Sequence, residues 1–191
     1  MRIAGIILAG GQGRRMGREK ALVPLSGVPL IARVLALAPQ VEAVAISANG
    51  DPGRFGLGLP VLPDRPGESG LGPMAGIRAG LDWAAGIGAE ALVSTATDTP
   101  FLPEDLVERL AAAAARPCAK LRARPLHRRA LARRRPFPGS TRSSPPTSGG
   151  LRAYLAGAVA VPFDTTPDPF ANLNTPEDLA RAEDRLRQNA P

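Results

Sequence analysis

Residues 3–20 read IAGIILAGGQGRRMGREK and join an apolar run to a glycine-rich loop. The first seven residues are continuously apolar, which is typical of a strand buried on both faces of a parallel sheet covered by helices. Three closely spaced glycines then allow the backbone to approach a ligand and to turn its N–H groups toward an anion. Four basic side chains stand in the same loop: Arg14, Arg15, Arg18 and Lys20. Arginine grips phosphate in a bidentate manner and lysine acts as a point charge, so the loop predicts a phosphate site.

Two familiar glycine loops do not fit this stretch. A Walker-type loop ends in Gly-Lys-Ser/Thr, whereas Lys20 lies between Glu19 and Ala21. A dinucleotide fingerprint needs a third glycine that opens a helix and an acid about 20 residues later. Met16 stands near the place of that glycine, and Arg33-Val34 occupies the later region. A plain glycine-rich turn with exposed arginines remains the alternative.

The remaining sequence predicts alternating strands and helices, because short apolar runs indicate strands and helically spaced apolar residues indicate helices. Strands are expected at residues 3–9, 44–48, 60–63 and 91–95. Helices are expected at residues 29–35 and 72–85 and in segments that begin at residues 103 and 175. The second of these helices should bury one apolar face, formed by Met74, Ile77, Leu81 and Ala84.

This alternation predicts a single α/β domain over residues 1–191, with a doubly wound, mostly parallel sheet and helices on both faces. The site is expected at the carboxyl ends of the strands.

The composition excludes several classes of protein. Of the 191 residues, 44% are hydrophobic and 21% charged, which is ordinary globular usage, and the 4% of aromatics argues against base-stacking platforms. One cysteine, Cys118, and one histidine, His127, exclude a disulfide framework and a Cys/His zinc cluster, and nothing around that histidine supports a catalytic triad. Without a membrane-length apolar run or a signal-peptide pattern, we expect a soluble, cytoplasmic protein.

Further motifs follow the glycine loop in a fixed order. They are LSGVPL (25–30), SAN (47–49), PD (63–64), GPMAG (72–76), TDTPFLP (97–103) and FANLNTP (170–176). Together with the loop they resemble the motifs of molybdenum cofactor guanylyltransferases, which are MobA-like NTP transferases that transfer GMP from GTP to molybdopterin. The resemblance covers residues 1–110 and 158–188 and implies a Rossmann-like nucleotidyltransferase fold.

The resemblance also implies a nucleotide site along the loop and the strand ends. Its expected nucleotide-binding residues are Leu8, Ala9, Gly10, Gly11, Gly13, Lys20, Asn49, Asp64 and Asp98. Backbone groups of the first three would line the nucleotide, and the next two glycines would cradle phosphate. Asn49 and Asp64 would lie on the base and ribose side, although Asn49 before Gly50 also suits a plain turn.

The catalytic residues that the resemblance implies are Lys20, Asp98 and Arg15. Lys20 would offset charge on the β- and γ-phosphates, and Asp98 would hold Mg²⁺, which binds through one or two carboxylates and shares its other positions with phosphate and water. Asn172 and Asn174 would face the pterin, while Asn174 also suits the cap of the last helix. The attacking phosphate of the cofactor is already anionic, so positioning and charge stabilisation suffice without a side-chain nucleophile.

The segment 116–150 departs from the family pattern. It is rich in arginine, proline and serine, shows no regular periodicity and lies in a part of the chain, from Arg109 to Phe163, without any Asp or Glu. The formal net charge of +7 originates entirely here, since acids outnumber bases elsewhere. The family normally has strands and a His-Pro element at this point, whereas His127 is followed by Arg128. Either the segment is read in a shifted frame, in which case we expect little order and an impaired enzyme, or it is a genuine basic loop that binds an anionic partner.

Three other functions remain open. A cytidylyltransferase of the same cofactor is one, although Leu8-Ala9-Gly10-Gly11 favours guanine, because the cytidine enzymes resemble Leu-Ala-Ala-Gly there. A sugar-phosphate nucleotidyltransferase is another, and a nucleic-acid-binding module built on the basic segment is the third. For the leading interpretation we expect GTP and the molybdenum cofactor as substrates. We also expect molybdopterin-handling proteins, acceptor molybdoenzymes or their chaperones as partners, no membrane or nucleic acid, and a monomer.

Overall fold

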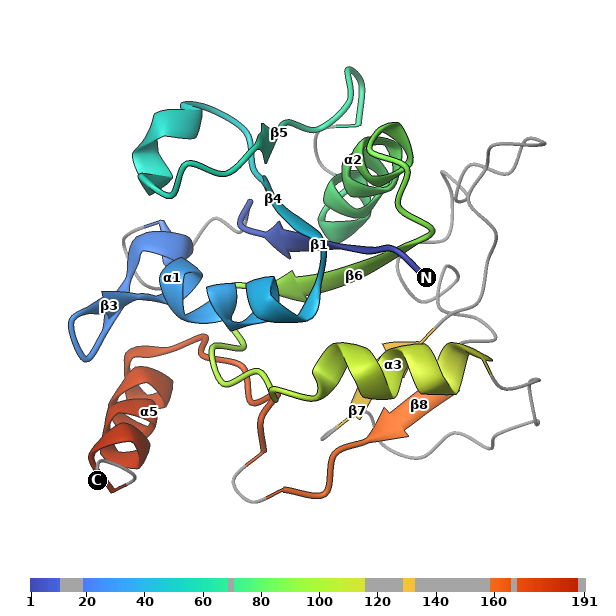
Figure 1. The fold of residues 1–191 in the computed structure, drawn as a ribbon. Helices are drawn as coiled ribbons and strands as arrows, with labels where there is room; N and C mark the ends of the chain where they lie inside the picture. The colour runs from blue at the N-terminus through green and yellow to red at the C-terminus, as the bar shows by residue number, and fades with distance from the viewer. Residues whose placement is uncertain (11–18, 69–70, 116–128, 133–158, 166–167, 189–191) are drawn as a thin grey trace.

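A four-stranded parallel sheet forms the centre of the molecule (Figure 1). The computed structural model describes residues 1–10, 19–68, 71–115, 129–132, 159–165 and 168–188. The sheet has the order β5-β4-β1-β6, and every neighbouring pair is parallel. Its strands are β1 (Ile3–Leu8), β4 (Ala43–Ser47), β5 (Val61–Leu62) and β6 (Ala91–Ala96). The predicted fold class, a doubly wound parallel sheet, is therefore confirmed.

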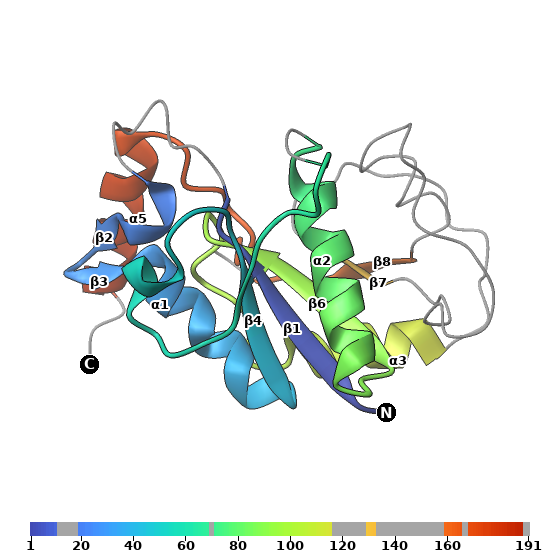
Figure 2. The same cartoon turned by 90° about the horizontal axis from the view of Figure 1, so that it is seen from above.

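The strand order creates a switch point beside β1. From β1 the chain moves outward to β4 and β5 and then returns to β6 on the other side of β1. At the carboxyl end of the sheet, Leu8 lies opposite Ser47 on one side and Ala96 on the other. Ligands of open α/β sheets bind where the order reverses, so this end of β1 is the expected crevice. In Figure 2 it points toward α5 (Pro176–Gln188) and away from the N-terminus.

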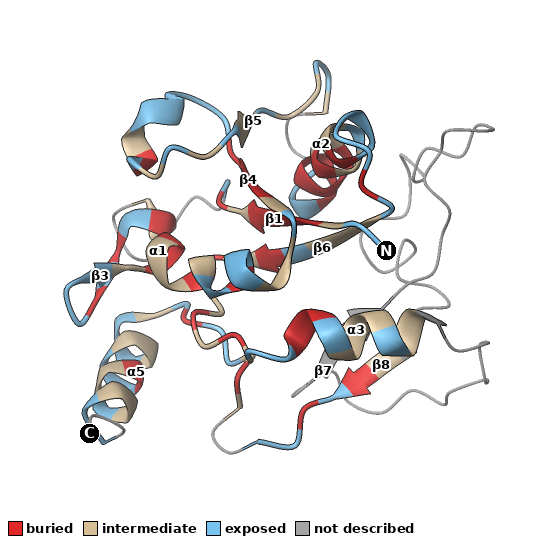
Figure 3. Ribbon diagram, viewed as in Figure 1, coloured by how far each residue is buried: buried red, intermediate tan, exposed pale blue. Residues whose placement is uncertain are grey.

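Helices cover both faces of the sheet (Figures 1 and 2). One face is covered by α2 (Pro73–Gly86), which contacts β1, β4 and β6. Toward the other lie α1 (Leu30–Val34), the 3₁₀ helix η2 (Leu35–Gln40) and α3 (Leu106–Ala115). Figure 3 shows buried residues concentrated along β1, β4 and the sheet-facing side of α2. The main apolar core packs Ile7 and Ile46 of the sheet against Ile31, Val34 and Leu37.

Two glycines let α2 lie unusually close to the sheet. A Cβ on Gly76 would overlap the Ser47 hydroxyl and stand 2.8 Å from Leu8 Cδ2, and one on Gly80 would stand 3.1 Å from Ile6 Cγ1. Both glycines are buried, whereas Leu81, expected on the buried face, is only half-buried. Met74, Ile77 and Ala84 of the predicted face are buried as expected, and the two glycines beside them set how close the helix lies to the sheet.

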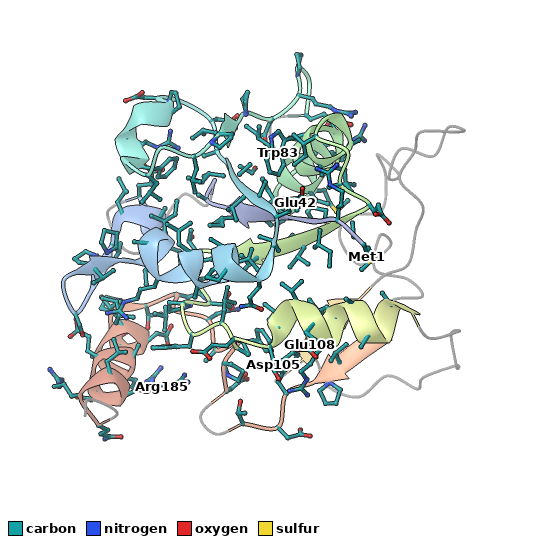
Figure 4. All side chains as sticks on the ribbon, viewed as in Figure 1. Met1, Glu42, Trp83, Asp105, Glu108 and Arg185 are labelled. Carbon is teal, nitrogen blue, oxygen red and sulfur yellow. The ribbon has the colours of Figure 1, made fainter. Side chains whose placement is uncertain are left out.

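The C-terminal helix lies toward the carboxyl end of the sheet (Figure 2). It packs on the hairpin of β2 (Pro24–Leu25) and β3 (Val28–Pro29), where Leu25, Leu30, Leu173 and Ala182 form a second apolar cluster. Arg185, labelled in Figure 4, holds its guanidinium 4.0 Å from the centre of the Phe101 ring. These contacts bring the last part of the chain beside residues from its beginning and its middle.

Several boundaries differ from those expected. The helix predicted at 29–35 ends at Val34 and continues as η2, which contains Pro39, and the helix expected from residue 103 begins at Leu106. Of the segment 116–150 the structure describes only β7 (Arg129–Ala132), which pairs antiparallel with β8 (Val159–Pro162), although no regular element was expected there. Two more 3₁₀ helices are η1 (Lys20–Leu22) and η3 (Pro52–Phe55). Within the described ranges, every helix is too short or too polar to cross a membrane.

We expect Gly76→Ala to lower the free energy of unfolding by about 1–3 kcal/mol, because the added methyl group must push α2 away from Ser47 and Leu8. The matched control is Gly86→Ala in the same helix, where a Cβ would meet no described atom within 4 Å. That variant should be neutral or stabilised by up to about 1 kcal/mol, since alanine favours helix. Denaturant unfolding of the three proteins measures both changes, and equal stabilities of the two variants would contradict the packing argument.

Candidate active site

The residues predicted for the site follow the carboxyl ends of the four parallel strands. Gly10 comes after β1, Asn49 after β4, Asp64 after β5 and Asp98 after β6. The pairing extends beyond the strands, because the Ala9 N–H donates to the Ser47 carbonyl at 2.9 Å. Three interstrand spacings separate β5 from β6, which gives an edge of about 14 Å. An edge of this length suits an extended ligand better than a single ion.

A cluster of three side chains stands at the β6 end of this edge. The Lys20 ammonium donates to Asp98 Oδ2 at 3.3 Å and to Asn174 Oδ1 at 2.6 Å. The Lys20 side chain is 13% exposed and that of Asp98 26% exposed, so the ion pair is partly shielded from water. Lys20 opens η1 directly after the glycine loop. The fold thus joins three predicted residues that lie 78 and 154 positions apart in the chain.

The backbone around Asn174 is fixed from both sides. The Leu173 N–H donates to the Asp98 carbonyl at 2.9 Å, and the Leu173 side chain is buried in the cluster beneath α5. On the other side, Asp178 Oδ2 accepts the N–H groups of Asn174 at 2.8 Å and of Thr175 at 2.9 Å. Asn174 is therefore held beside Asp98 by main-chain bonds. Asn172, also predicted for the pterin side, is exposed two residues earlier.

Thr175 and Asp178 form the reciprocal cap of α5. The Thr175 hydroxyl accepts the Asp178 N–H at 3.2 Å, while the Asp178 carboxylate accepts the Thr175 N–H. The hydrogen bond from the Asn174 N–H is the main reason why the pKa of the Asp178 carboxyl lies below its ordinary range. Hydrogen bonds from Thr175 and Arg181 lower this pKa further, and partial burial opposes them only in part. The ionised carboxylate therefore stabilises the segment that carries Asn174.

Asn49 and Asp64 form a second polar group, beyond β4 and β5. The Asn49 amide donates from Nδ2 to Asp64 Oδ2 at 2.7 Å, and its Oδ1 accepts the Asp64 N–H at 2.8 Å. Asn49 is exposed and Asp64 half-exposed, so the pair faces outward at the rim of the sheet. This reciprocal pairing shows that Asn49 is more than a turn residue, because it fixes the Asp64 backbone.

The remaining predicted residues divide into two groups. Leu8 ends β1 half-buried, Ala9 is 1% exposed, and Gly10 is exposed with no described atom within 4 Å of an added Cβ. Gly11, Gly13 and Arg15 lie outside the described residues.

One contact of the site was not expected from the sequence. Arg54 of η3 donates from Nε to Glu19 Oε1 at 2.8 Å and stacks 4.3 Å from the centre of the Phe55 ring. It thereby ties the residue before Lys20 to the loop after β4. The feature of the sequence that could have indicated this contact is Glu19, an acid in a loop of basic residues.

The donor set around Lys20 suits a hard cation that shares its ligands with phosphate. Asp98 offers a carboxylate oxygen and Asn174 an amide oxygen, and both already converge on one positive charge, the ammonium. Among the described residues no three His, Cys, Asp or Glu side chains gather as a complete metal cage. Mg²⁺ is compatible with so few protein ligands, because it is commonly bound by one or two carboxylates with phosphate and water.

Known proteins resemble this chain in sequence and in fold. Residues 5–161 match the MobA-like NTP transferase domain. A molybdenum cofactor guanylyltransferase of Rhodobacter capsulatus is 81% identical over 191 residues, and one of Cereibacter sphaeroides is 47% identical over 208 aligned positions; both alignments cover 100% of each chain. The crystal structure of molybdopterin-guanine dinucleotide biosynthesis protein A from Archaeoglobus fulgidus shares the fold, with a TM-score of 0.63 at 22% identity over 97% of this chain and 99% of that one.

The fold and site thus define a nucleotidyltransferase. The chain belongs to the MobA-like NTP transferase family, within the branch of the molybdenum cofactor guanylyltransferases.

The lowered pKa of Asp178 predicts a pH-dependent contribution to stability. Because the folded-state pKa lies below the ordinary value of 3.8, the stabilisation is fully present above that value and is lost as the pH falls through the folded-state pKa. We expect Asp178→Asn to be less stable than the wild type at neutral pH and the difference to shrink toward about pH 3. Urea unfolding across this range measures the difference, and a gap that stays constant or widens on acidification would contradict the assignment.

Proposed function

We propose that this chain transfers GMP from GTP to molybdopterin, giving the guanine dinucleotide form of the cofactor and pyrophosphate. The observation that carries the proposal is the Lys20 ammonium held between Asp98 and Asn174 at the switch point of the sheet. The names of the relatives, which are molybdenum cofactor guanylyltransferases at up to 81% identity over the whole chain, support it independently.

In this proposal Lys20 is the mobile positive charge of the site. When a triphosphate enters, the ammonium exchanges its contacts with Asp98 and Asn174 for β- and γ-phosphate oxygens. Its charge then stabilises the pyrophosphate, on which negative charge develops as the bond to the α-phosphorus breaks. Arg15 adds charge from the preceding loop, and backbone N–H groups of Gly11 and Gly13 hold phosphate oxygens.

The attacking group is a phosphate oxygen of molybdopterin. It forms a bond to the α-phosphorus of GTP while the bond to pyrophosphate breaks, and it needs no base because it is already ionised. Asn172 and Asn174 orient this second substrate. The contribution of the protein is therefore the alignment of two anions, which otherwise repel each other.

Asp98 is the residue that we expect to hold Mg²⁺, with the Asn174 amide oxygen close by. When bound, Mg²⁺ neutralises phosphate charge. Asp98 is well placed for this role because its backbone is fixed by Leu173, while its side chain is 26% exposed and, among the described residues, pairs with one displaceable cation, Lys20.

We expect Asp98→Ala to lower turnover by about 100-fold or more, since it removes the metal ligand. GTP should still bind weakly, because the backbone loop and Lys20 remain. Release of pyrophosphate from GTP, with molybdopterin and Mg²⁺, measures turnover, and calorimetry measures GTP binding. Asp184→Ala is the control, because Asp184 pairs only on the surface of α5, with Arg187 at 2.5 Å and both side chains at least 60% exposed.

Unchanged turnover in Asp98→Ala would contradict the proposed function. The binding-module interpretation instead requires steeply salt-dependent nucleic-acid binding through the segment 116–150, which Asp98→Ala would leave unchanged.

Gly10 is proposed to select guanine, with Asn49 and Asp64 on the base and ribose side. Because an added Cβ at Gly10 would meet no described atom within 4 Å, packing alone does not require glycine there. We expect tighter binding of GTP than of CTP, and Gly10→Ala should weaken GTP binding while changing the unfolding free energy by less than about 0.5 kcal/mol. Calorimetry with both nucleotides and Mg²⁺ tests this, and tighter binding of CTP to the wild type would indicate the cytidylyltransferase instead.

The wider setting follows from the substrates. We propose that the chain acts as a monomer in the cytoplasm, where GTP is present. Its product would pass to acceptor molybdoenzymes or their chaperones, and molybdopterin-handling proteins would supply the second substrate.

For the segment 116–150 we propose a shifted reading frame. What supports this is the loss of acids and of regular apolar periodicity inside a chain that otherwise follows the family pattern. Resequencing the gene tests the idea: paired insertions and deletions should restore alternating apolar strands and a His-Pro element. If resequencing finds a shifted frame, the present chain should be impaired on the pterin side. If it confirms the present frame, the segment is a genuine basic loop.

A further inference from the structure

We propose that Asp178 is a positioning residue for the active site: through the backbone of Asn174 it fixes the amide oxygen that holds the Lys20 ammonium. The inference deepens the proposed function and rests on it for its catalytic consequence, while its structural part can be tested without turnover.

Asp178 makes one hydrogen bond more than a helix cap needs. In a capping box the acid at the third helical position accepts the N–H of the capping residue, here Thr175. Asp178 Oδ2 accepts that N–H at 2.9 Å and also the N–H of Asn174 at 2.8 Å, one residue before the cap. Its Oδ1 accepts from Arg181 at 2.5 Å, so both oxygens are engaged. The bond to Asn174 adds nothing to the helix itself and acts on the residue that points to Lys20.

The position of the Asn174 backbone determines the position of its amide oxygen. An asparagine side chain has only two torsions, so Oδ1 stays close to its own main chain. That main chain is held by Asp178 on one side and, through Leu173, by the Asp98 carbonyl on the other. The contacts form a closed ring: Asp98 binds Lys20, Lys20 binds Asn174, and Leu173 returns to Asp98. Asp178 anchors this ring to α5.

The other acids of α5 have different partners. Glu177 bonds to its own N–H and to the Thr175 side chain, Glu183 accepts the Ser26 N–H of the β2–β3 turn at 3.2 Å, and Asp184 pairs with Arg187. The Asp178 side chain is only 21% exposed, and its pKa is held low first of all by the Asn174 N–H. Among the described acids of this helix, Asp178 is the one whose carboxylate is hydrogen-bonded to an active-site residue, Asn174, and that bond favours its ionised form.

Lysine acetylation gives a test that is independent of turnover. The chain has two lysines, Lys20 and Lys120, so acetic anhydride labelling followed by mass spectrometry reports the reactivity of Lys20 against an internal reference. Asn174→Ala and Asp178→Ala should each raise the relative reactivity of Lys20 about fivefold or more, as expected for the loss of one hydrogen bond to the ammonium. The double variant should show no further rise, because both substitutions release the same contact.

Thr175→Ala is the matched control. It removes the other half of the cap and a similar amount of helix stability but leaves the bond from the Asn174 N–H to Asp178 in place. Its Lys20 reactivity should equal that of the wild type. If Asp178→Ala folds poorly, Asp178→Asn replaces it in the test. Because the asparagine side chain would keep an acceptor oxygen, the rise in Lys20 reactivity of Asp178→Asn over the wild type should be smaller than the rise in Asn174→Ala. The proposal is overturned if Asp178→Ala and Thr175→Ala label alike, or if the effects of Asp178→Ala and Asn174→Ala multiply in the double variant.

The same variants report on catalysis. We expect kcat/KM for pyrophosphate release to fall about tenfold to 100-fold in Asp178→Ala and to fall no further when Asn174→Ala is added. A wild type whose segment 116–150 has been verified by resequencing, and which labels as expected but releases no pyrophosphate from GTP, would refute the proposed function and leave the positioning role standing. Normal turnover in Asp178→Ala would refute the catalytic consequence of that role.

Discussion

The ion pair between Lys20 and Asp98 is the contact that organises this site. It joins the end of the glycine loop to the end of β6 across the carboxyl edge of the sheet, and its partial burial strengthens it relative to an exposed pair. In the structure each group neutralises the other. In the proposed function the ammonium would turn to a nucleoside triphosphate and the carboxylate to its metal ion.

The rest of the fold holds those two residues together. The parallel sheet brings four strand ends to one edge, and the switch point beside β1 leaves that edge open. On one face, the small residues of α2 allow it to lie close behind the edge, near Leu8 and Ser47. At the open end, the segment before α5 returns across the molecule and adds Asn174 to the pair. The nucleotide and pterin halves of the proposed site therefore meet at Lys20.

The sequence predicts those features of this arrangement that depend on neighbouring residues in the chain or on the common edge of parallel strands. Short apolar runs placed the four strands of the central sheet to within one residue, and the site was expected at their carboxyl ends, where the fold joins Lys20 and Asp98, two residues that the resemblance implied. Asn174 was expected on the pterin side from the resemblance, but its bond to Lys20 joins residues 154 positions apart, which no spacing rule reveals. The bond between Arg54 and Glu19 was missed for the same reason. The close approach of α2 was missed because hydrophobic patterns do not register glycine. The roles of the site residues, including those of Gly11, Gly13 and Arg15, remain predictions.

A crystal structure of the chain with GTP and Mn²⁺ tests the central claim most directly, because manganese replaces magnesium and is located by its anomalous scattering. We predict a manganese peak at coordinating distance from the Asp98 carboxylate, with the Lys20 ammonium moved from Asn174 onto the triphosphate. A triphosphate and metal bound elsewhere, with Lys20 and Asp98 still paired to each other, would contradict the account.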